Sequence, residues 1–317
     1  MWNRITEDNW IKIIEGLNLP IFFKHDYLKS ISKSFSLQLN YFSFFKNSQV
    51  VSLFAFFTTS NRDIIIPEGF SYSPFFIQAD LNEKLYVDTI TSLIKILKKD
   101  FKNIKLKLPT DITDVRPFIW ENFSAEIKYT HIKKNGLLPE ISVLKSLGKD
   151  FNNDYQFKVE ELNKSSLMLN LEFLKTLNFS QKKITQHEAL LKNWANCGYL
   201  KAFSLYRSNS LVCSNLVLIG YYNSKAFTIL LNKADKQFKY AHANLYSNII
   251  LWCRENSINS IDFCGANFQS ISEFKSRFNT DLKIYFVVNY QPINNLLLKL
   301  KGMVAKTIIK FKNVNNS

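Results

Sequence analysis

Hydrophobic positions in the first half of the chain change from helical spacing to strand spacing and back. Apolar residues recur every three or four positions over 8–17, and Pro20 lies just beyond that pattern, which predicts an amphipathic helix that ends before the proline. The same test of spacing predicts a helix over 27–35, a hairpin formed by 37–45 and 50–57, a strand over 63–66, a helix over 82–99, a strand over 104–108, a short helix over 114–122 and a strand over 125–132.

The second half of the chain repeats this order of elements. Two helices come first, and Gly198 follows the second one, as glycine commonly does at a helix C-terminus. The elements predicted are helices over 160–177 and 181–197, a hairpin formed by 200–206 and 211–222, a strand over 226–231, a helix over 244–256, a strand over 260–263, a helix over 270–278 and a strand over 282–289.

The two halves also correspond in residue type. The hairpin segment 42–48 aligns with 203–209, and Leu85-Tyr86 opens the long helix of the first half as Leu245-Tyr246 opens that of the second. Both pairs are separated by about 160 positions, which indicates a duplication rather than the alternative of chance similarity between two hairpins.

The repeat divides the chain into three parts. We predict one α/β unit over 1–155, a second over 156–291, and a basic amphipathic helix and tail over 292–317. Each unit starts from an antiparallel hairpin, so its sheet is mixed, of the α+β type, with helices packed on it. The strictly alternating order of a doubly wound parallel fold is absent from both halves.

Composition fits a folded intracellular protein. Hydrophobic residues make up 46% of the chain and charged residues 21%, which is typical of globular domains. The four cysteines form no CxxC pair and no histidine stands at zinc spacing, so we predict no metal site and a reducing cytoplasm. Charged residues scattered through 1–17 argue against a signal peptide, and no apolar run approaches the length of a membrane span.

The net charge of +15 has two interpretations. It could match a polyanionic partner, such as RNA, an anionic membrane surface or a phosphorylated ligand. It could equally reflect a compositional drift that enriches surface lysine and asparagine everywhere. Charge alone does not decide between them.

Two neighbouring segments carry a recognisable motif. Residues 261–267 read Ile-Asp-Phe-Cys-Gly-Ala-Asn, and residues 273–279 read Glu-Phe-Lys-Ser-Arg-Phe-Asn. This resembles the C-terminal signature of Fem-type and related GNAT acyltransferases, in which an Asp-Phe-x-Gly turn and a short helix precede Phe-Lys-x-x-Phe-Gly. The family's last glycine is Asn279 here, a residue type that tolerates a left-handed backbone.

The resemblance covers about the last 120 residues, and the first half matches as a degenerate copy. It implies two tandem GNAT-like units and an enzyme that moves an acyl or aminoacyl group onto an amine, on a cell-envelope or glycan precursor. In that family the lysine that corresponds to Lys275 is thought to lie at the acyl-transfer site. A fixed ammonium there stabilises an oxyanion or binds a donor phosphate, whereas the alternative is a solvated helix lysine.

Further candidate residues surround this motif. Asp262 is a candidate proton acceptor, or else caps the turn that follows it. His242 precedes a helix N-terminus, where a neutral imidazole could act as a base, or it is an ordinary satisfied histidine. Asn244, Gly265 and Arg277 are candidate donor-binding residues, although a glycine between strand and helix is required first for the turn. Tyr206 and Arg207 end a hairpin strand and are candidates for substrate binding.

The identity of the acyl donor is open. No glycine occurs between Gly220 and Gly265 or between Gly69 and Gly136, so the glycine-rich loop that often cradles coenzyme A is missing. Fem-type enzymes take the acyl group from aminoacyl-tRNA, which suits the net charge. We therefore expect no tightly bound cofactor and a donor that is either acyl-coenzyme A or aminoacyl-tRNA.

Two alternatives accompany this prediction. The chain could be a catalytically inactive GNAT-fold module that binds RNA or an anionic membrane surface. The predicted helix over 294–312, in which apolar residues alternate with lysines, either docks on RNA or on anionic lipid at the inner face of the membrane, or packs its apolar face on the second unit. A DNA-binding regulator is not expected, because no helix-turn-helix pattern is present.

Overall fold

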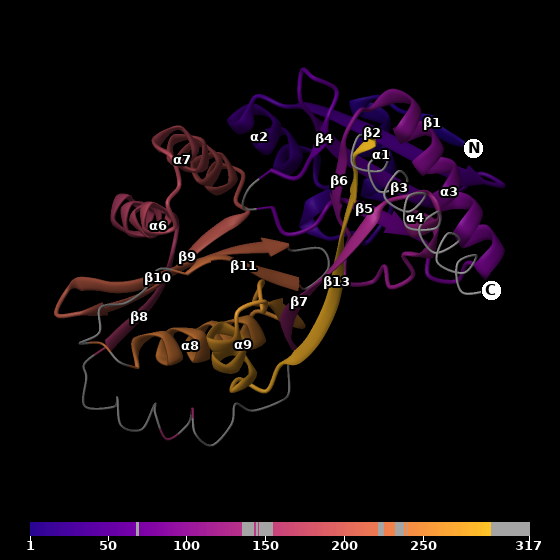
Figure 1. Cartoon of the computed structure of the whole chain (residues 1–317). Coiled ribbons are helices and arrows are strands. Elements are labelled where there is room, and N and C mark those ends of the chain that lie inside the picture. Colours follow the sequence, from indigo (N-terminus) through magenta and orange to yellow (C-terminus); the bar gives the residue numbers. More distant parts are fainter. Residues whose placement is uncertain are drawn as a thin grey trace, which may run out of the picture.

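A single mixed sheet runs through the whole molecule (Figure 1). In this computed structural model the described residues are 1–67, 70–134, 143, 145, 155–220, 225–231, 238 and 240–292. They form a 13-stranded sheet in the order β1-β2-β3-β4-β6-β13-β7-β12-β11-β10-β9-β8, with β5 paired to β3. The helix predicted over 294–312 lies outside the described residues.

The first half supplies one hairpin-led set of elements. They are β1 (Trp2–Arg4), α1 (Glu7–Glu15), the 3-10 helix η1 (Ile21–Phe23), α2 (His25–Phe35), β2 (Gln38–Lys46), β3 (Gln49–Thr58), β4 (Ile64–Ile65), β5 (Phe75–Ile77), α3 (Glu83–Asp100), β6 (Ile104–Lys107), α4 (Arg116–Trp120) and β7 (Ser124–Lys134). The predicted hairpin, long helix and following strand are all present, as the spacing of apolar residues requires.

The second half supplies a matching set. Its elements are β8 (Tyr155–Glu160), α6 (Lys164–Thr176), α7 (Gln181–Asn196), β9 (Leu200–Arg207), β10 (Ser210–Gly220), β11 (Lys225–Leu231), α8 (Ala241–Glu255), β12 (Ser260–Asp262), α9 (Gln269–Ser276) and β13 (Asp281–Tyr290). The mixed α/β fold class predicted from the sequence is confirmed, with two tandem units of the same element order.

The start of the second half differs from the prediction. The helix expected from residue 160 begins at Lys164, because Asn163 caps it: the Asn163 side chain accepts from the Ser166 amide at 2.9 Å, and the Ser166 hydroxyl accepts from the Asn163 amide. This reciprocal cap fixes the first turn. The residues before it form the strand β8, which the sequence reading missed.

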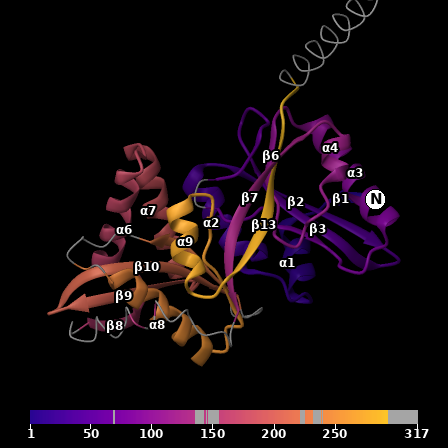
Figure 2. The same cartoon turned by 60° about the horizontal axis from the view of Figure 1, so that its bottom comes forward.

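The two units exchange their last strands. β7 from the first half pairs with β12 of the second, while β13 from the second half lies between β7 and β6 of the first. Figures 1 and 2 show β7 and β13 side by side as long strands that join the two halves. Val288 of β13 is fully buried and belongs to the core of the first unit, around α3. Each unit is therefore completed by a strand of the other.

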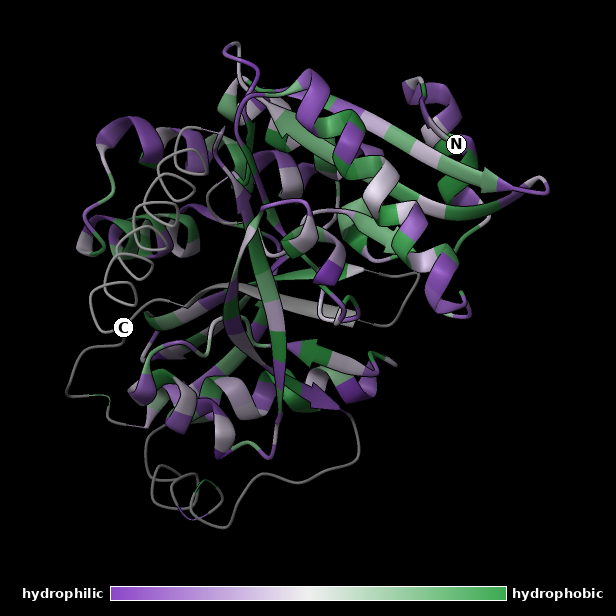
Figure 3. Cartoon of the chain, turned by 45° about the vertical axis from the view of Figure 1, so that its right-hand side comes forward, coloured by the Kyte–Doolittle hydropathy of each residue, from purple (hydrophilic) through white to green (hydrophobic). Residues whose placement is uncertain are grey.

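A second contact joins the units through their helices. The rings of Tyr27 on α2 and Trp194 on α7 stack with centroids 4.7 Å apart, and the Trp194 indole donates to the Tyr27 carbonyl. One apolar core contains both residues together with side chains from both halves. Figure 3 shows hydrophobic and polar residues interspersed along both strands and helices. The shared core joins the two halves, beside one further apolar cluster around α3 and another around α8.

We expect the whole chain to unfold as one cooperative unit. Leu93, fully buried on α3 in the first unit, is a suitable probe, and Leu93→Ala should cost about 2–5 kcal/mol of unfolding free energy. Because the units share strands, the slowest hydrogen exchange at α8, in the second unit, should accelerate with it. The exposed Lys95→Ala on the same helix is the control. Unchanged exchange at α8 in the Leu93 variant would show that the halves unfold independently.

Candidate active site

The turn after β12 is held together by one lysine. Cys264 and Gly265 both have positive φ, 48° and 64°, a backbone conformation that glycine adopts easily and cysteine rarely does. The Lys275 ammonium on α9 donates to the carbonyl oxygens of Phe263 at 2.7 Å and Gly265 at 2.8 Å, and also to that of Cys264. These three bonds stabilise the strained turn.

Lys275 is therefore engaged with the protein itself. Its side chain is only 6% exposed, and burial lowers its pKa. An ammonium group has three hydrogen-bond donors, and all three go to the turn. The catalytic role expected for Lys275 stays a prediction, but this geometry is that of a residue that positions the turn.

Asp262 lies at the end of β12 and collects donors from three segments. One carboxylate oxygen accepts from the Thr130 hydroxyl at 2.5 Å and from the Cys264 amide at 2.8 Å, and the other accepts from the Tyr72 hydroxyl at 2.7 Å. The residue is 4% exposed. A buried carboxylate needs such donors to remain in the fold. Asp262 caps the turn by accepting from the Cys264 amide, which is the structural role considered for it in the sequence. Its other oxygen accepts from the phenol of Tyr72, a residue of the first unit.

The first unit adds a cation to this cluster. The Lys107 ammonium lies 5.6 Å from the ring centre of Tyr72 and 5.1 Å from that of Tyr285, within cation–π range. It also donates to the Phe70 carbonyl at 3.4 Å. Burial lowers the pKa of Lys107, although nearby Cys264 and Asp262 oppose that shift. Lys107 has fewer close hydrogen bonds than Lys275, so it is the cation better placed to receive an additional anionic group.

The other ionisable groups of the cluster stay neutral at ordinary pH. Burial and the neighbouring Asp262 raise the pKa of Tyr72 well above its usual value, so its phenol keeps the proton that it donates. Burial raises the pKa of the Cys264 thiol to about 12. A thiol is a weak nucleophile until it ionises, so its burial argues against Cys264 as a covalent nucleophile.

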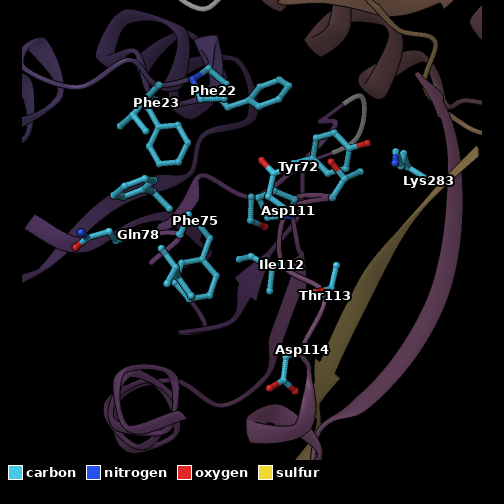
Figure 4. A pocket seen from close by; sticks show the side chains of 18 of the residues that line it. Phe22, Phe23, Tyr72, Phe75, Gln78, Asp111, Ile112, Thr113, Asp114 and Lys283 are labelled. Carbon is cyan, nitrogen blue, oxygen red and sulfur yellow. The ribbon is translucent and has the colours of Figure 1, made fainter. Parts of the chain in front are cut away.

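A groove of about 1140 Å³ opens beside this cluster. Asp262 and Tyr72 both line it, together with side chains of η1, the segment around β5, the loop after β6 and the strands β7 and β13. Figure 4 shows the rings of Phe22, Phe23 and Phe75 and the loop residues from Asp111 to Asp114 around this space. The groove therefore lies between the two units, with the buried carboxylate on its wall.

His131 and Lys133 of β7, which were not among the sequence candidates, contact α9 and the turn that follows it. The His131 ring lies 2.9 Å from the Ser272 hydroxyl and 2.9 Å from the Thr280 hydroxyl, and burial lowers its pKa. The Lys133 ammonium donates to the Phe278 carbonyl at 2.8 Å and to the Asn279 carbonyl. Asn279 has φ 55°, so asparagine keeps the left-handed turn where the family has glycine.

The remaining sequence candidates lie at two places. His242 and Asn244 stand in the first turn of α8, which connects the parallel strands β11 and β12; a connecting helix begins at the carboxyl end of the strand before it, the edge that also bears Asp262. Arg277 is exposed and directly follows α9. These positions are compatible with donor binding, which stays a prediction for them and for Gly265.

Tyr206 and Arg207 are distant from the motif. The strand registers pair Asp262 with Phe227, Phe227 with Leu218, and Leu218 with Leu200. Tyr206 therefore lies three strands away and six residues further along β9, a shift of about 20 Å in the strand direction. Its hydroxyl donates to the Glu160 carboxylate at 2.6 Å. Neither residue lines the described groove, and the substrate-binding role expected for them stays a prediction.

Solved structures share this arrangement. FemX superposes with a TM-score of 0.62 at 11% identity over 90% of this chain and 96% of its own. The C-terminal domain of a candidate lysylphosphatidylglycerol synthetase from Agrobacterium fabrum gives 0.60 at 9% identity, over 94% and 97% of the two chains. A tandem GNAT protein of the clavulanic acid biosynthesis pathway gives 0.53 at 8%, over 91% and 97%.

These similarities establish the fold, which is that of two tandem GNAT units, as in Fem-like proteins. No protein-family model matches the sequence, and no curated protein is significantly similar to it. Within the described ranges, the structure contains no cluster of three or more residues suited to hold a metal ion. None of the helices described there has the length and apolar character that crossing a membrane requires.

We expect Lys275→Met to destabilise the protein by roughly 1.5–3 kcal/mol, because it removes a charged donor from three carbonyl oxygens of the turn. Urea unfolding would measure the loss, and the exposed Lys182→Met on α7 should change the unfolding free energy by less than about 0.5 kcal/mol. Equal stability of the two variants would mean that Lys275 does not hold the turn.

Proposed function

We propose that the protein is an N-acyltransferase that moves an acyl or aminoacyl group to an amine at the junction of its two units. The observation that carries this proposal is the buried Asp262 carboxylate, which accepts from Tyr72 and Thr130 of the first half and from the Cys264 amide of the second, and lines the groove between them. In a GNAT fold the parallel pair β11 and β12 is the part of the sheet where a donor is expected, and Asp262 ends that pair.

The reaction balances without a covalent enzyme intermediate. The neutral amine attacks the donor carbonyl, a C–N bond forms, and the C–S bond of a thioester or the C–O bond of an aminoacyl ester breaks. One amine proton passes to Asp262 and then to the leaving thiolate or alkoxide, so the products are an amide and a thiol or hydroxyl. A carboxylate on the groove wall has the position that a general base requires.

Lys107 and Lys275 have different roles in this proposal. Lys275 shapes the turn that presents Asp262, since its donors are engaged there. Lys107 supplies positive charge from the first unit, over two tyrosine rings beside the same carboxylate. A fixed cation stabilises the oxyanion of a tetrahedral intermediate more strongly in a buried site than in water.

The N-terminus of α8 is the proposed binding place for donor phosphates. A helix N-terminus attracts anions because the positive end of the helix dipole lies there. Both acyl-coenzyme A and aminoacyl-tRNA carry phosphates. The names of the similar solved structures do not decide between these donors. One name describes the synthesis of lysylphosphatidylglycerol, and the name of the tandem GNAT protein mentions acetyl-coenzyme A. A cell-envelope precursor is one acceptor that this function would include.

We expect the full-length protein to transfer radiolabelled acyl groups from acetyl-coenzyme A or from aminoacyl-tRNA to a panel of primary amines. Asp262→Asn should lower the rate by about 100-fold or more, the usual contribution of a general base. The exposed Asp88→Asn is the matched control. Tyr72→Phe, which removes one donor to Asp262 and leaves the carboxylate, should retain more activity than Asp262→Asn.

Two outcomes would contradict the proposal. The first is salt-sensitive binding of RNA or of anionic vesicles without transfer from either donor, which would favour the inactive binding module. The second is full activity of a folded Asp262→Asn protein, which would remove the carboxylate from the mechanism.

The pH dependence tests Lys107 separately. Its folded pKa is lowered, so the ammonium is present below that pKa and lost above it, at a lower pH than for an ordinary lysine. Activity should therefore fall on the alkaline side as this group deprotonates. Lys107→Arg keeps the charge and should move that fall to higher pH, whereas Lys107→Met should lower the rate below the Lys107 pKa, where the wild-type ammonium is charged, and should remove the alkaline fall. An alkaline limb that is the same in wild type and Lys107→Arg would exclude this role.

A further inference from the structure

The groove between the units has an apolar, aromatic wall. Phe22 and Phe23 of η1 and Phe75 of β5 are all buried and line it, and Ile112 from the loop after β6 lies among them. Figure 4 shows these side chains gathered on one side of the space. Such a wall binds the hydrocarbon or ring portion of a ligand, because contact with it removes apolar surface from water.

The cations of the groove are mostly engaged with protein carboxylates. Arg116 bonds Asp114 and Glu83, each at 2.8 Å, and Lys134 bonds Asp281 at 3.1 Å. Within the described part of the chain, Lys283 is the groove cation without an ion pair. A diphosphate is normally bound by several convergent cationic or amide donors, and this wall offers few that are uncommitted.

Two carboxylates of the groove stand outside these ion pairs. Asp111 is exposed at the groove and forms no ion pair with a described residue, while Asp262 stands at the wall beside Tyr72. Figure 4 shows Asp111 in the same close-up as the aromatic rings. A positively charged amine carried on an apolar body matches both features, because it pairs with carboxylates and buries its hydrocarbon part against the rings.

We propose that the acceptor class of this groove is a primary amine on an apolar or aromatic body, rather than a phosphorylated glycan. This inference rests on the proposed acyltransferase function and names the acceptor of the same site. A volume of about 1140 Å³ accommodates a ligand at least as large as a typical drug molecule, so the acceptor extends well beyond the amine itself.

Ligand-observed NMR on the full-length protein, without any donor, tests separately whether the amine and the apolar body of the ligand contribute to binding. 4-Phenylbutylamine carries both features, 4-phenylbutanol lacks the amine, and ethanolamine lacks the apolar body. We expect the first to bind at least tenfold more tightly than either of the others. UDP-N-acetylglucosamine represents the phosphorylated glycans and should not compete with it.

Variants locate the binding in the groove. Thr113, exposed on the groove loop, becomes an obstruction in Thr113→Trp, which should weaken 4-phenylbutylamine binding at least tenfold; the exposed Thr185→Trp on α7 is the matched control. Asp111→Asn should weaken binding up to about fivefold, the range of one exposed charge pair. Asp88→Asn should leave it unchanged.

The outcomes separate this inference from the proposed function. Binding of 4-phenylbutylamine that Thr113→Trp abolishes supports the acceptor class even if neither donor yields transfer, in which case the transferase proposal fails alone. Tighter binding of UDP-N-acetylglucosamine or of ethanolamine overturns the acceptor class, even if acyl transfer to some amine is observed. Binding that is equal in Thr113→Trp and Thr185→Trp also overturns it, because the ligand would then lie outside the groove.

Discussion

The exchange of β7 and β13 between the units is the constraint on which the rest of the structure depends. β13 completes the sheet of the first half and β7 that of the second, so neither half can pair its central strands alone. The exchange also brings the ends of β6 and β12 to the same region. Lys107 at the end of β6 and Asp262 at the end of β12 therefore belong to one cluster, although 155 positions of the 317-residue chain separate them in sequence.

The junction between the two units contains several buried ionisable side chains. Lys107, Lys133 and Lys275 all have pKa values lowered by burial, and Asp262 is the buried carboxylate among them. Carbonyl oxygens and tyrosine faces stabilise the cations, since an unpaired buried charge would cost several kcal/mol. Buried cations and one buried carboxylate thus lie together behind the aromatic groove. The proposed acyl transfer would benefit from the nearby cations, because negative charge develops on the carbonyl oxygen during attack.

The sequence revealed the local parts of this arrangement and missed the parts that come from tertiary structure. Asp262 and Lys275 stand in one contiguous motif, and the left-handed turn at Asn279 follows from residue type. Tyr72 carries no such signal, because it reaches Asp262 across the unit boundary. Lys107 shares its strand and its face with Lys105, and alternation alone cannot show that only one of them lies under two tyrosine rings. The strand β8 does carry a signal in the sequence, the alternation of apolar and polar residues over 155–160.

The strand exchange also has a consequence for how the chain is made. The ribosome releases β6 and β7 early, but β13, which must lie between them, is among the last described residues. At ordinary elongation rates the gap from residue 134 to residue 290 takes on the order of 10–30 s. During that interval the first half has every element of its own, yet its central sheet stays open with unpaired strand edges. The N-terminal half of the nascent chain thus cannot complete its folding first. Folding of the whole molecule depends on synthesis of the C-terminal half.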